Sequence, residues 1–377
     1  MKVLILSTFQ SSGGAGIAST RLMHALRKNG VEVSMLCRKN ISFGPAGLRK
    51  QSWTSIFERA YIWMCNGFST RNLWATDIAL FGQDITSTCE YKEADVIHLH
   101  WVNQGFISLA TIRKMLDDGK KVVWTMHDAW NAMGAYHLKI QRKDDYLERS
   151  TFERKQRLYA DRKIQFVTCS QWLMNEALTS PLMAEQRVVA IPNPLDTSVF
   201  KPVPHQNRRR VLFVAQFVNN PMKGMKYLEE ASAIINEKVT KFGHADSNRV
   251  EIIALGRDIP YISDTHEMAR LYASVDAFVL PSLSENLPNT IMEAMACGTP
   301  CVGFRVGGIP EMIDHLENGY LANYKDSEDL AKGILYVLDE ANHERLCKSA
   351  REKVMKCYSE KSVAEQYLQI YQGVKKS

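Results

Sequence analysis

The sequence contains no long apolar run and no cysteine pattern that would define a class of protein. None of its apolar stretches approaches the roughly 20 residues that a membrane-spanning helix needs. The opening MKVLILSTF is too short an apolar stretch for a signal peptide, and no cleavage-type region follows it. The eight cysteines include no CxxC pair and no zinc spacing, so we expect buried free thiols. We therefore expect a cytoplasmic protein that is soluble or peripheral on a membrane.

A strong charge of either sign is also missing. Lys and Arg number 47 and Asp and Glu 41, which gives a net charge of +6 over 377 residues. That excess is too weak to indicate nucleic-acid binding, but it suits an anionic substrate or an anionic membrane surface. With 45% hydrophobic residues and ordinary amounts of Gly and Pro, the chain should fold, and its length favours two domains.

Short β-branched segments alternate with helical ones on both sides of a proline-rich break. Expected strands before the break are 2–7, 32–37, 96–100, 121–126 and 165–169, with a helix at 17–29. Residues 191–210 contain four prolines and a basic run, and we interpret them as a linker. Expected strands after it are 210–215, 250–255, 277–280, 299–304 and 320–322, with a helix at 223–236. The pattern predicts an α/β protein of two Rossmann-like domains, 1–200 and 201–357.

The strongest candidate site lies in residues 281–298, PSLSENLPNTIMEAMACG. A helix is expected over 288–297, closed by Gly298, with Pro288 at the first helical position. The next three amide N–H groups are then unpaired and form an anion site suited to a diphosphate. These amides belong to Asn289, Thr290 and Ile291.

Two glutamates flank that anion site. Glu285 lies just before it and Glu293 about one turn inside the helix, where their carboxylates can accept hydrogen bonds from hydroxyl pairs of a sugar or a ribose. The commoner role of a glutamate at a helix start is a cap or a solvated surface charge. Spacing alone leaves both alternatives open.

The sequence around these glutamates resembles glycosyltransferase family four, whose members are retaining enzymes with the GT-B fold. FVLPSLSEN, EAMACGTPCVGFRVGGIPE and NGYLA carry the resemblance, together with IPNPLDTSVFKP at 191–202 and the pair His127 and Asp128. It spans nearly the whole chain. It implies two domains facing each other across a cleft, the first binding the acceptor and the second the donor. It also implies that residues 358–377 include a helix that crosses back to the first domain.

The resemblance implies a function as well as a fold. We expect a retaining glycosyltransferase that moves a sugar from a UDP- or GDP-linked donor to a glycan or lipid-linked acceptor in cell-surface polysaccharide synthesis. No other cofactor and no metal ion is expected. In the family, the residue matching Glu285 contacts donor-sugar hydroxyls and the one matching Glu293 contacts the ribose.

A glycine-rich segment, SSGGAG at 11–16, separates the first expected strand from the first helix. Glycines let a backbone approach a ligand closely. Gly14 and Gly16 open a dinucleotide fingerprint and Arg38 could meet an NADP phosphate, but the sixth fingerprint position is Ser19. An NADP oxidoreductase is therefore the weaker alternative. The resemblance instead assigns Gly13, Gly14 and Ala15 to the donor phosphate and sugar.

His127 follows the expected strand 121–126, at the carboxyl end where parallel sheets build their sites. A lone histidine is more often a structural hydrogen-bonding group, but the resemblance places this one at the donor sugar. His98 and His100 should share one face of their strand, which suits a metal, although no third ligand is identifiable. Acceptor contacts are predicted at His100, Trp101, Tyr136 and His137.

Lys223 follows the first strand of the second half and offers a point charge to a leaving diphosphate. The family commonly has a Gly-Arg pair at the end of that strand, whereas this chain has Ala215 and Gln216. Gln216 stays in the predicted donor set, but one positive charge is missing unless Arg257 or Arg305 replaces it. The departure motivates an alternative function, a nucleotide-sugar- or glycan-binding subunit with impaired catalysis.

Aromatic and basic residues gather in the first half. All seven tryptophans lie at or before Trp172, several of them in or beside expected loops. Residues 49–69 are basic and then aromatic at roughly helical spacing, and residues 139–163 are rich in Lys and Arg. Such segments suit peripheral contact with a membrane and a lipid-linked acceptor. The alternatives are core tryptophans and a surface helix packed on its own domain.

Overall fold

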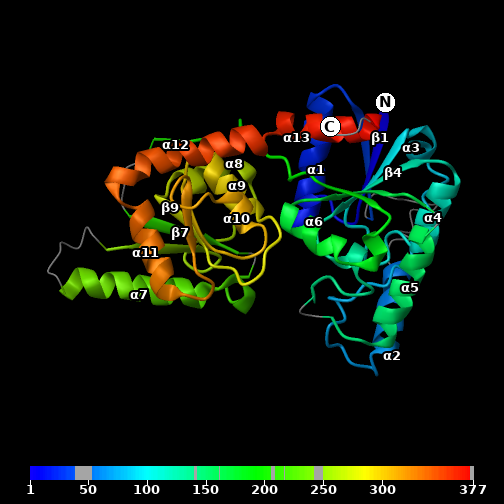
Figure 1. The fold of residues 1–377 in the computed structure, drawn as a ribbon, viewed down its shortest axis with the longest axis horizontal. Helices are drawn as coiled ribbons and strands as arrows, with labels where there is room; N and C mark the ends of the chain where they lie inside the picture. Colours follow the sequence, from blue (N-terminus) through cyan, green and yellow to red (C-terminus); the bar gives the residue numbers. More distant parts are fainter. Residues whose placement is uncertain are drawn as a thin grey trace. The chain divides into compact units, whose positions relative to one another are not determined.

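The computed structural model describes residues 1–38, 53–139, 142–160, 162–204, 209–215, 217–241 and 249–373. The chain divides into two compact units, Met1–Pro192 with Ala364–Ser377, and Asn193–Val363 (Figure 1). The division falls inside the proline-rich segment 191–210. Each unit has its own parallel sheet with helices on its faces, so the predicted pair of Rossmann-like α/β domains is confirmed.

The sheet of the first unit has six strands in the order β2-β1-β3-β4-β5-β6, and every neighbouring pair is parallel. The strands are β1 Lys2–Ser7, β2 Glu32–Cys37, β3 Val96–Leu99, β4 Lys121–Met126, β5 Gln165–Thr168 and β6 Arg187–Ala190. The helices are α1 Gly13–Lys28, α2 Trp53–Cys65, α3 Cys89–Glu93, α4 Leu109–Asp117, α5 Tyr146–Ala160 and α6 Gln171–Leu178. The short turns η1 Trp130–Ala132 and η3 Pro181–Met183 complete it. The sequence pattern missed β6, a four-residue strand.

The sheet of the second unit has five parallel strands in the order β11-β10-β9-β7-β8. They are β7 Arg210–Val214, β8 Glu251–Leu255, β9 Ala277–Leu280, β10 Cys301–Phe304 and β11 Gly319–Ala322. Its helices are η4 Pro221–Lys223, α7 Met225–Lys241, α8 Thr265–Ala273, α9 Asn289–Ala296, α10 Ile309–Met312, α11 Ser327–Val337 and α12 Glu340–Cys357. Helices α7 and α11 pack on one face of this sheet, and α8, α9 and α12 on the other (Figure 1).

Apolar runs explain why these strands are central. Parallel strands covered on both faces read as continuous hydrophobic segments, and β1 buries every residue from Val3 to Ser7. The side chains of Trp124 and Phe166 stack beneath the first sheet with ring centroids 5.9 Å apart. Trp130 is also buried, so it belongs to the core rather than to a loop surface as its sequence position suggested.

The last helix, α13 Glu360–Gln372, completes the first unit from the far end of the chain. Its residues from Ala364 on belong to that unit. Tyr371 Oη lies 2.6 Å from Nδ1 of His98, and Tyr367 Oη lies 3.0 Å from Oγ1 of Thr125. Both tyrosines are buried, so α13 is part of the core of this unit.

The glycine-rich segment 11–16 is mostly helical rather than a loop. α1 begins at Gly13, four residues earlier than predicted, with Ser12 as its extended N-cap. A Cβ on Gly16 would come within 2.9 Å of the Phe9 carbonyl oxygen, so the first turn packs directly on the chain that leaves β1. This close packing outweighs the low helix propensity of glycine.

The predicted linker is held firmly to the second unit. Leu195 and Phe200 are buried in it. Arg351 on α12 donates to the carbonyl oxygens of Phe200 and Ala296, each at 2.6 Å, and to that of Thr197 at 2.9 Å. The apolar residues between the prolines therefore pack this segment against the second unit.

All eight cysteines lie in the described part of the chain and carry free thiols. Four are buried as expected, but Cys65 and Cys89 are exposed. Across the described residues, none of the helices has both the length and the apolarity that crossing a bilayer requires.

Candidate functional site

The strand order of the second sheet reverses between β7 and β9. From β7 the chain continues to β8 on one side, whereas β9 leads to β10 and β11 on the other. In open parallel sheets, ligands bind in the crevice outside the carboxyl ends of the strands at such a reversal. Lys223 follows β7 and Glu285 follows β9, so two predicted site residues lie at this point.

The two side chains form an ion pair. Lys223 Nζ lies 2.5 Å from Glu285 Oε1, with the lysine one-third exposed and the glutamate 12% exposed. A partly exposed ammonium can attract a phosphate oxygen, and a carboxylate can accept hydrogen bonds from hydroxyls. The pair therefore offers both functions that a nucleotide sugar needs.

Glycines fix the backbone around the pair. Gly224 has a φ of +75°, and a Cβ there would lie 1.9 Å from the Pro281 carbonyl oxygen. Gly307, with a φ of +57°, would bring a Cβ to 1.7 Å from the Glu285 carbonyl oxygen. The loops after β7 and β10 thus both press on the loop after β9, and only glycine fits at these contacts.

The start of α9 differs from the prediction by one residue. Pro288 is the N-cap, with an extended ψ of 114°, and the helix begins at Asn289. Consequently the Ile291 amide is not unpaired, because it donates to the Pro288 carbonyl oxygen at 3.2 Å in a tight first turn. Thr290 is half-buried, and the Asn289 side chain accepts from Asn193 at 3.2 Å. Asn193 was not singled out in the sequence.

Glu293 lies on the second turn of α9 and is buried, 8% exposed. The two arginines considered as replacements for the missing family arginine differ. Arg257 is paired with Glu229 and Asp258, whereas Arg305 directly follows β10 and is exposed. Gln216 lies outside the described residues.

The carboxyl edge of the first sheet gathers a second polar cluster. Thr8, after β1, donates its amide to the Trp101 carbonyl oxygen at 2.7 Å, and Phe9 stacks on the Trp101 ring. His127, after β4, places Nε2 2.9 Å from Nδ1 of His100. The predicted residues His100, Trp101 and His127, which follow two neighbouring strands, therefore meet here beside the chain that leaves β1.

Burial favours the neutral form of His100 and His127. Burial lowers the pKa of His127 to about 4 and that of His100 well below its ordinary value. The rings of His98 and His100 lie 4.4 Å apart, which confirms that they share a face. His98, however, is bonded to Tyr371 and Thr125, and the described residues hold no group of three or more metal-ligating side chains.

His137 is held between two carboxylates. Its Nδ1 lies 2.7 Å from Asp128 Oδ2 and its Nε2 2.8 Å from Asp77 Oδ2. Burial lowers the pKa of His137, but Asp128 and Asp77 together raise it more, to about 10. Asp128 also accepts from the Trp101 indole at 3.1 Å. Tyr136 is buried and donates to Asp145. Both residues thus have internal partners, and their contact with an acceptor stays a prediction.

Comparison with known proteins assigns both units. Residues 12–199 match the model described as Glycosyltransferase Family 4, and residues 208–340 match the one described as Glycosyl transferases group 1. The chain belongs to the family 4 glycosyltransferases. Over 394 aligned residues it is 24% identical to N-acetyl-alpha-D-glucosaminyl L-malate synthase of Bacillus anthracis, covering 99% of this chain and 98% of that one.

Solved structures share the GT-B fold of this glycosyltransferase. Sucrose-phosphate synthase from Thermosynechococcus elongatus aligns with a TM-score of 0.67 at 19% identity, over 99% and 98% of the two chains. Anabaena HepE in complex with UDP-glucose aligns with a TM-score of 0.60 at 16% identity, over 99% and 100%. A shorter match at 30% identity, to a diacetylbacillosaminyl-diphospho-undecaprenol N-acetylgalactosaminyltransferase of Campylobacter jejuni, covers 41% of this chain and 43% of that one.

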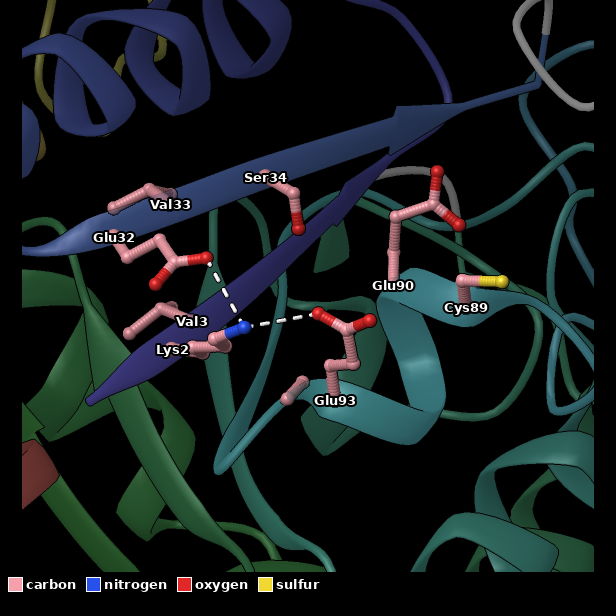
Figure 2. A pocket seen from close by; sticks show the side chains of 9 residues that line it. Lys2, Val3, Glu32, Val33, Ser34, Cys89, Glu90 and Glu93 are labelled. Carbon is pink, nitrogen blue, oxygen red and sulfur yellow. Dashed lines mark hydrogen bonds and ion pairs between the residues drawn. The ribbon is translucent and has the colours of Figure 1, made fainter.

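Two cavities in the glycosyltransferase lie away from the predicted site residues. One of about 290 Å³ opens at the amino ends of β1 and β2, where Lys2 pairs with Glu93 and Glu32 (Figure 2). Another of about 500 Å³ lies beside Val275 and Thr299, at the amino ends of β9 and β10. Ligands of parallel sheets bind at the opposite, carboxyl ends, so neither cavity is our candidate site.

Proposed function

We propose that this glycosyltransferase is a retaining, metal-independent enzyme that moves a hexosyl group from a UDP- or GDP-linked sugar to a glycan or lipid-linked acceptor in cell-surface polysaccharide synthesis. The observation that carries the proposal is the ion pair of Lys223 and Glu285 at the strand reversal. We place the reaction at the cytoplasmic side of the cell membrane.

The known proteins support this choice of substrates. HepE was crystallised with UDP-glucose, which favours a uridine nucleotide, and a relative from Corynebacterium glutamicum is a GDP-mannose-dependent mannosyltransferase. The name of the Campylobacter jejuni relative includes diphospho-undecaprenol, a lipid carrier. These names support a nucleotide-sugar donor and a lipid-linked acceptor without selecting one pair.

The chemistry follows from where charge develops. The bond between the anomeric carbon and the diphosphate oxygen breaks, and a new bond forms to the acceptor oxygen. In our proposal the Lys223 ammonium and the amides at the start of α9, from Asn289 and Thr290, stabilise the departing diphosphate. The acceptor proton passes to the leaving phosphate, so no pair of catalytic carboxylates is needed.

The remaining predicted residues hold the substrate. Glu285 accepts hydrogen bonds from donor-sugar hydroxyls and Glu293 from the ribose. In the first unit, the α1 start at Gly13, Gly14 and Ala15 contacts the donor phosphate and sugar, and His127 contacts the sugar beside the reaction centre. Binding energy from these contacts orients the anomeric carbon.

A thermal-shift panel of UDP, GDP, ADP and their sugars tests the donor, because a ligand that binds the folded state raises the Tm. Hydrolysis or transfer of the selected donor is then compared in the native chain, in Glu285→Ala and in the control Glu317→Ala, which alters an exposed glutamate. Activity that collapses only in Glu285→Ala supports the proposal. Donor binding without turnover in the native chain indicates the binding subunit instead, and an inverted anomer in the product NMR spectrum excludes retention.

A further inference from the structure

Helix α2 exposes apolar side chains and buries charged ones, the opposite of an ordinary surface helix. Trp53 is 61% exposed and Phe57 52% exposed, and Ile56, Trp63 and Met64 are exposed as well. The only two charged residues of the helix, Glu58 and Arg59, are instead buried. A surface helix normally turns its apolar stripe to the core and its charges to water.

A network of buried bonds fixes this rotation of α2. Arg59 donates to the Asp77 carboxylate and, at 2.9 Å, to the Thr76 carbonyl oxygen. Glu58 Oε1 accepts from the amides of Ile78 at 3.1 Å and Ala79 at 3.3 Å. Turning the aromatic side chains inward would strip both buried side chains of their partners, which is strongly unfavourable for a buried charged group. The exposed aromatics are therefore a stable feature of the fold.

The exposed aromatic region continues beyond the helix. Trp63 packs edge-on against exposed Phe68 with ring centroids 4.8 Å apart, and the ring centroids of Phe57 and Phe81 lie 6.2 Å apart. Trp74, 65% exposed, lies under the Arg59 guanidinium. We call this region, made of Trp53, Ile56, Phe57, Trp63, Met64, Phe68 and Trp74, the α2 surface. Contiguous apolar regions on a soluble chain mark an interaction site.

The polar side chains of α2 are already used within the unit. Thr54 donates to the Gly105 carbonyl oxygen at 2.7 Å, and Ser55 accepts from Arg38 at 3.5 Å. A protein interface surrounds its apolar core with a polar rim that forms about one hydrogen bond per 100–200 Å². The helix face offers no exposed charged side chain for such a rim. Tryptophan-rich apolar surfaces of this kind, here with one exposed basic residue, Arg71, between Phe68 and Trp74 in the chain, suit the interfacial zone of a bilayer.

We propose that the α2 surface inserts into the interfacial zone of a lipid bilayer, with α2 lying in the membrane plane. The proposal rests on the lipid-linked acceptor proposed above, because such an acceptor resides in the same bilayer. It keeps the aromatic part of the predicted segment 49–69, whose basic residues 49–52 lie outside the described part of the chain. In 139–163, Arg142 and Arg149 are paired with Glu148 and Asp144.

Vesicle sedimentation tests the α2 surface. The native chain is mixed with vesicles of phosphatidylcholine alone and with added phosphatidylglycerol, at low and at high salt. Because the side chains that form the surface are apolar, binding should occur with both vesicles and persist at high salt, where screening removes charge-driven attraction. The variant Trp53→Ser/Phe57→Ser/Trp63→Ser should bind about tenfold or more weakly, since each 1.4 kcal/mol of lost binding is tenfold. Its Tm should change little because these side chains are exposed.

A matched variant changes exposed apolar side chains elsewhere, Trp172→Ser/Tyr261→Ser/Met355→Ser, and should bind as the native chain does. No binding by the native chain, equal losses in both variants, or binding abolished by high salt each overturns the proposal. So does a native dimer that the α2 variant converts to a monomer, because a second copy would then cover the surface. Nucleotide-induced Tm shifts are recorded on the same samples. Vesicle binding without any nucleotide-induced Tm shift would contradict the donor proposal but support the α2 surface.

Discussion

Lys223 Nζ lies 2.5 Å from Glu285 Oε1 across the strand reversal of the second sheet. Each charged group can bind one kind of substrate group: the ammonium a phosphate, and the carboxylate a hydroxyl that donates to it. Without a substrate the two side chains satisfy one another, which lowers the cost of holding both charges in a crevice. In our proposal the pair is a preformed part of the donor site.

Removing the ammonium should impair turnover far more than stability. In Lys223→Met we expect the rate of donor cleavage to fall about 10²-fold or more, because one lost contact to a developing anion costs that much. The Tm should shift only slightly, since the side chain is partly exposed. Steady-state kinetics measure the effect, and Lys226→Met, which alters an exposed lysine on α7, is the control. An unchanged rate in Lys223→Met would exclude this role.

Gly307 and Gly119 should respond differently to the same substitution. Both have a positive φ, but a Cβ on Gly307 meets the Glu285 carbonyl oxygen at 1.7 Å, whereas one on Gly119 meets no described atom within 4 Å. Gly119→Ala should cost about 1–2 kcal/mol of backbone strain. Gly307→Ala should cost clearly more and should weaken nucleotide-sugar binding, because the Glu285 backbone must move. Denaturant unfolding and the thermal-shift assay measure both effects, and equal costs would contradict the packing argument.

The charge of His137 should make stability depend on alkaline pH. Burial lowers its pKa, but Asp128 and Asp77 raise it to about 10, above the ordinary value of about 6.5. A histidine whose pKa is raised in the folded state stabilises the protein fully at pH values below its pKa in the unfolded chain. This contribution is lost as pH rises through about 10. His137→Gln should therefore lower the Tm most at pH values up to about 6.5 and flatten its decline between about 6.5 and 10.

His266→Gln, an exposed histidine on α8, serves as the control for that pH series and should follow the native curve. Parallel curves for His137→Gln and the native chain would show that the imidazole is not charged between its two carboxylates.

The tautomer of His127 follows from its neighbours. The Cys169 thiol can donate to the Met126 carbonyl oxygen, so its sulfur can accept from Nδ1–H of His127 at 3.4 Å. His100 Nε2 is buried and has no hydrogen-bond partner among the residues that the structure describes, and an unpaired lone pair there costs less than an unpaired N–H. His100 should then donate from Nδ1 to Nε2 of His127. Nitrogen-15 NMR near pH 7 should show His127 neutral with its proton on Nδ1; a proton on Nε2 would contradict this arrangement.

The alternation of short apolar strand segments with helical segments predicted the two sheets. Parallel strands read as continuous apolar runs, and the strands around Val3 and Phe278 have such runs. Lys223 and Glu285 could also be placed together, because each follows a strand of the same sheet. The predicted start of α9 was wrong by one residue, because the extended ψ of Pro288 makes it the N-cap and the helix begins at Asn289.

Other features depend on contacts between distant residues. Nothing near Asp77 in the sequence indicates that it pairs with both Arg59 and His137. Periodicity would turn the aromatic stripe of WTSIFERAYIWMC toward the core, whereas the buried pairing of Arg59 turns it outward. Long-range ion pairs of this kind leave no periodic signal.

The position of α13 in the first unit has a consequence for how the protein is made. Chains are synthesised from the amino end, and domains commonly fold in that order as they emerge. Here His98 and Thr125 gain their partners Tyr371 and Tyr367 only after the whole second unit has been synthesised. The second unit can therefore complete its core before the first, so the order of folding should oppose the order of synthesis.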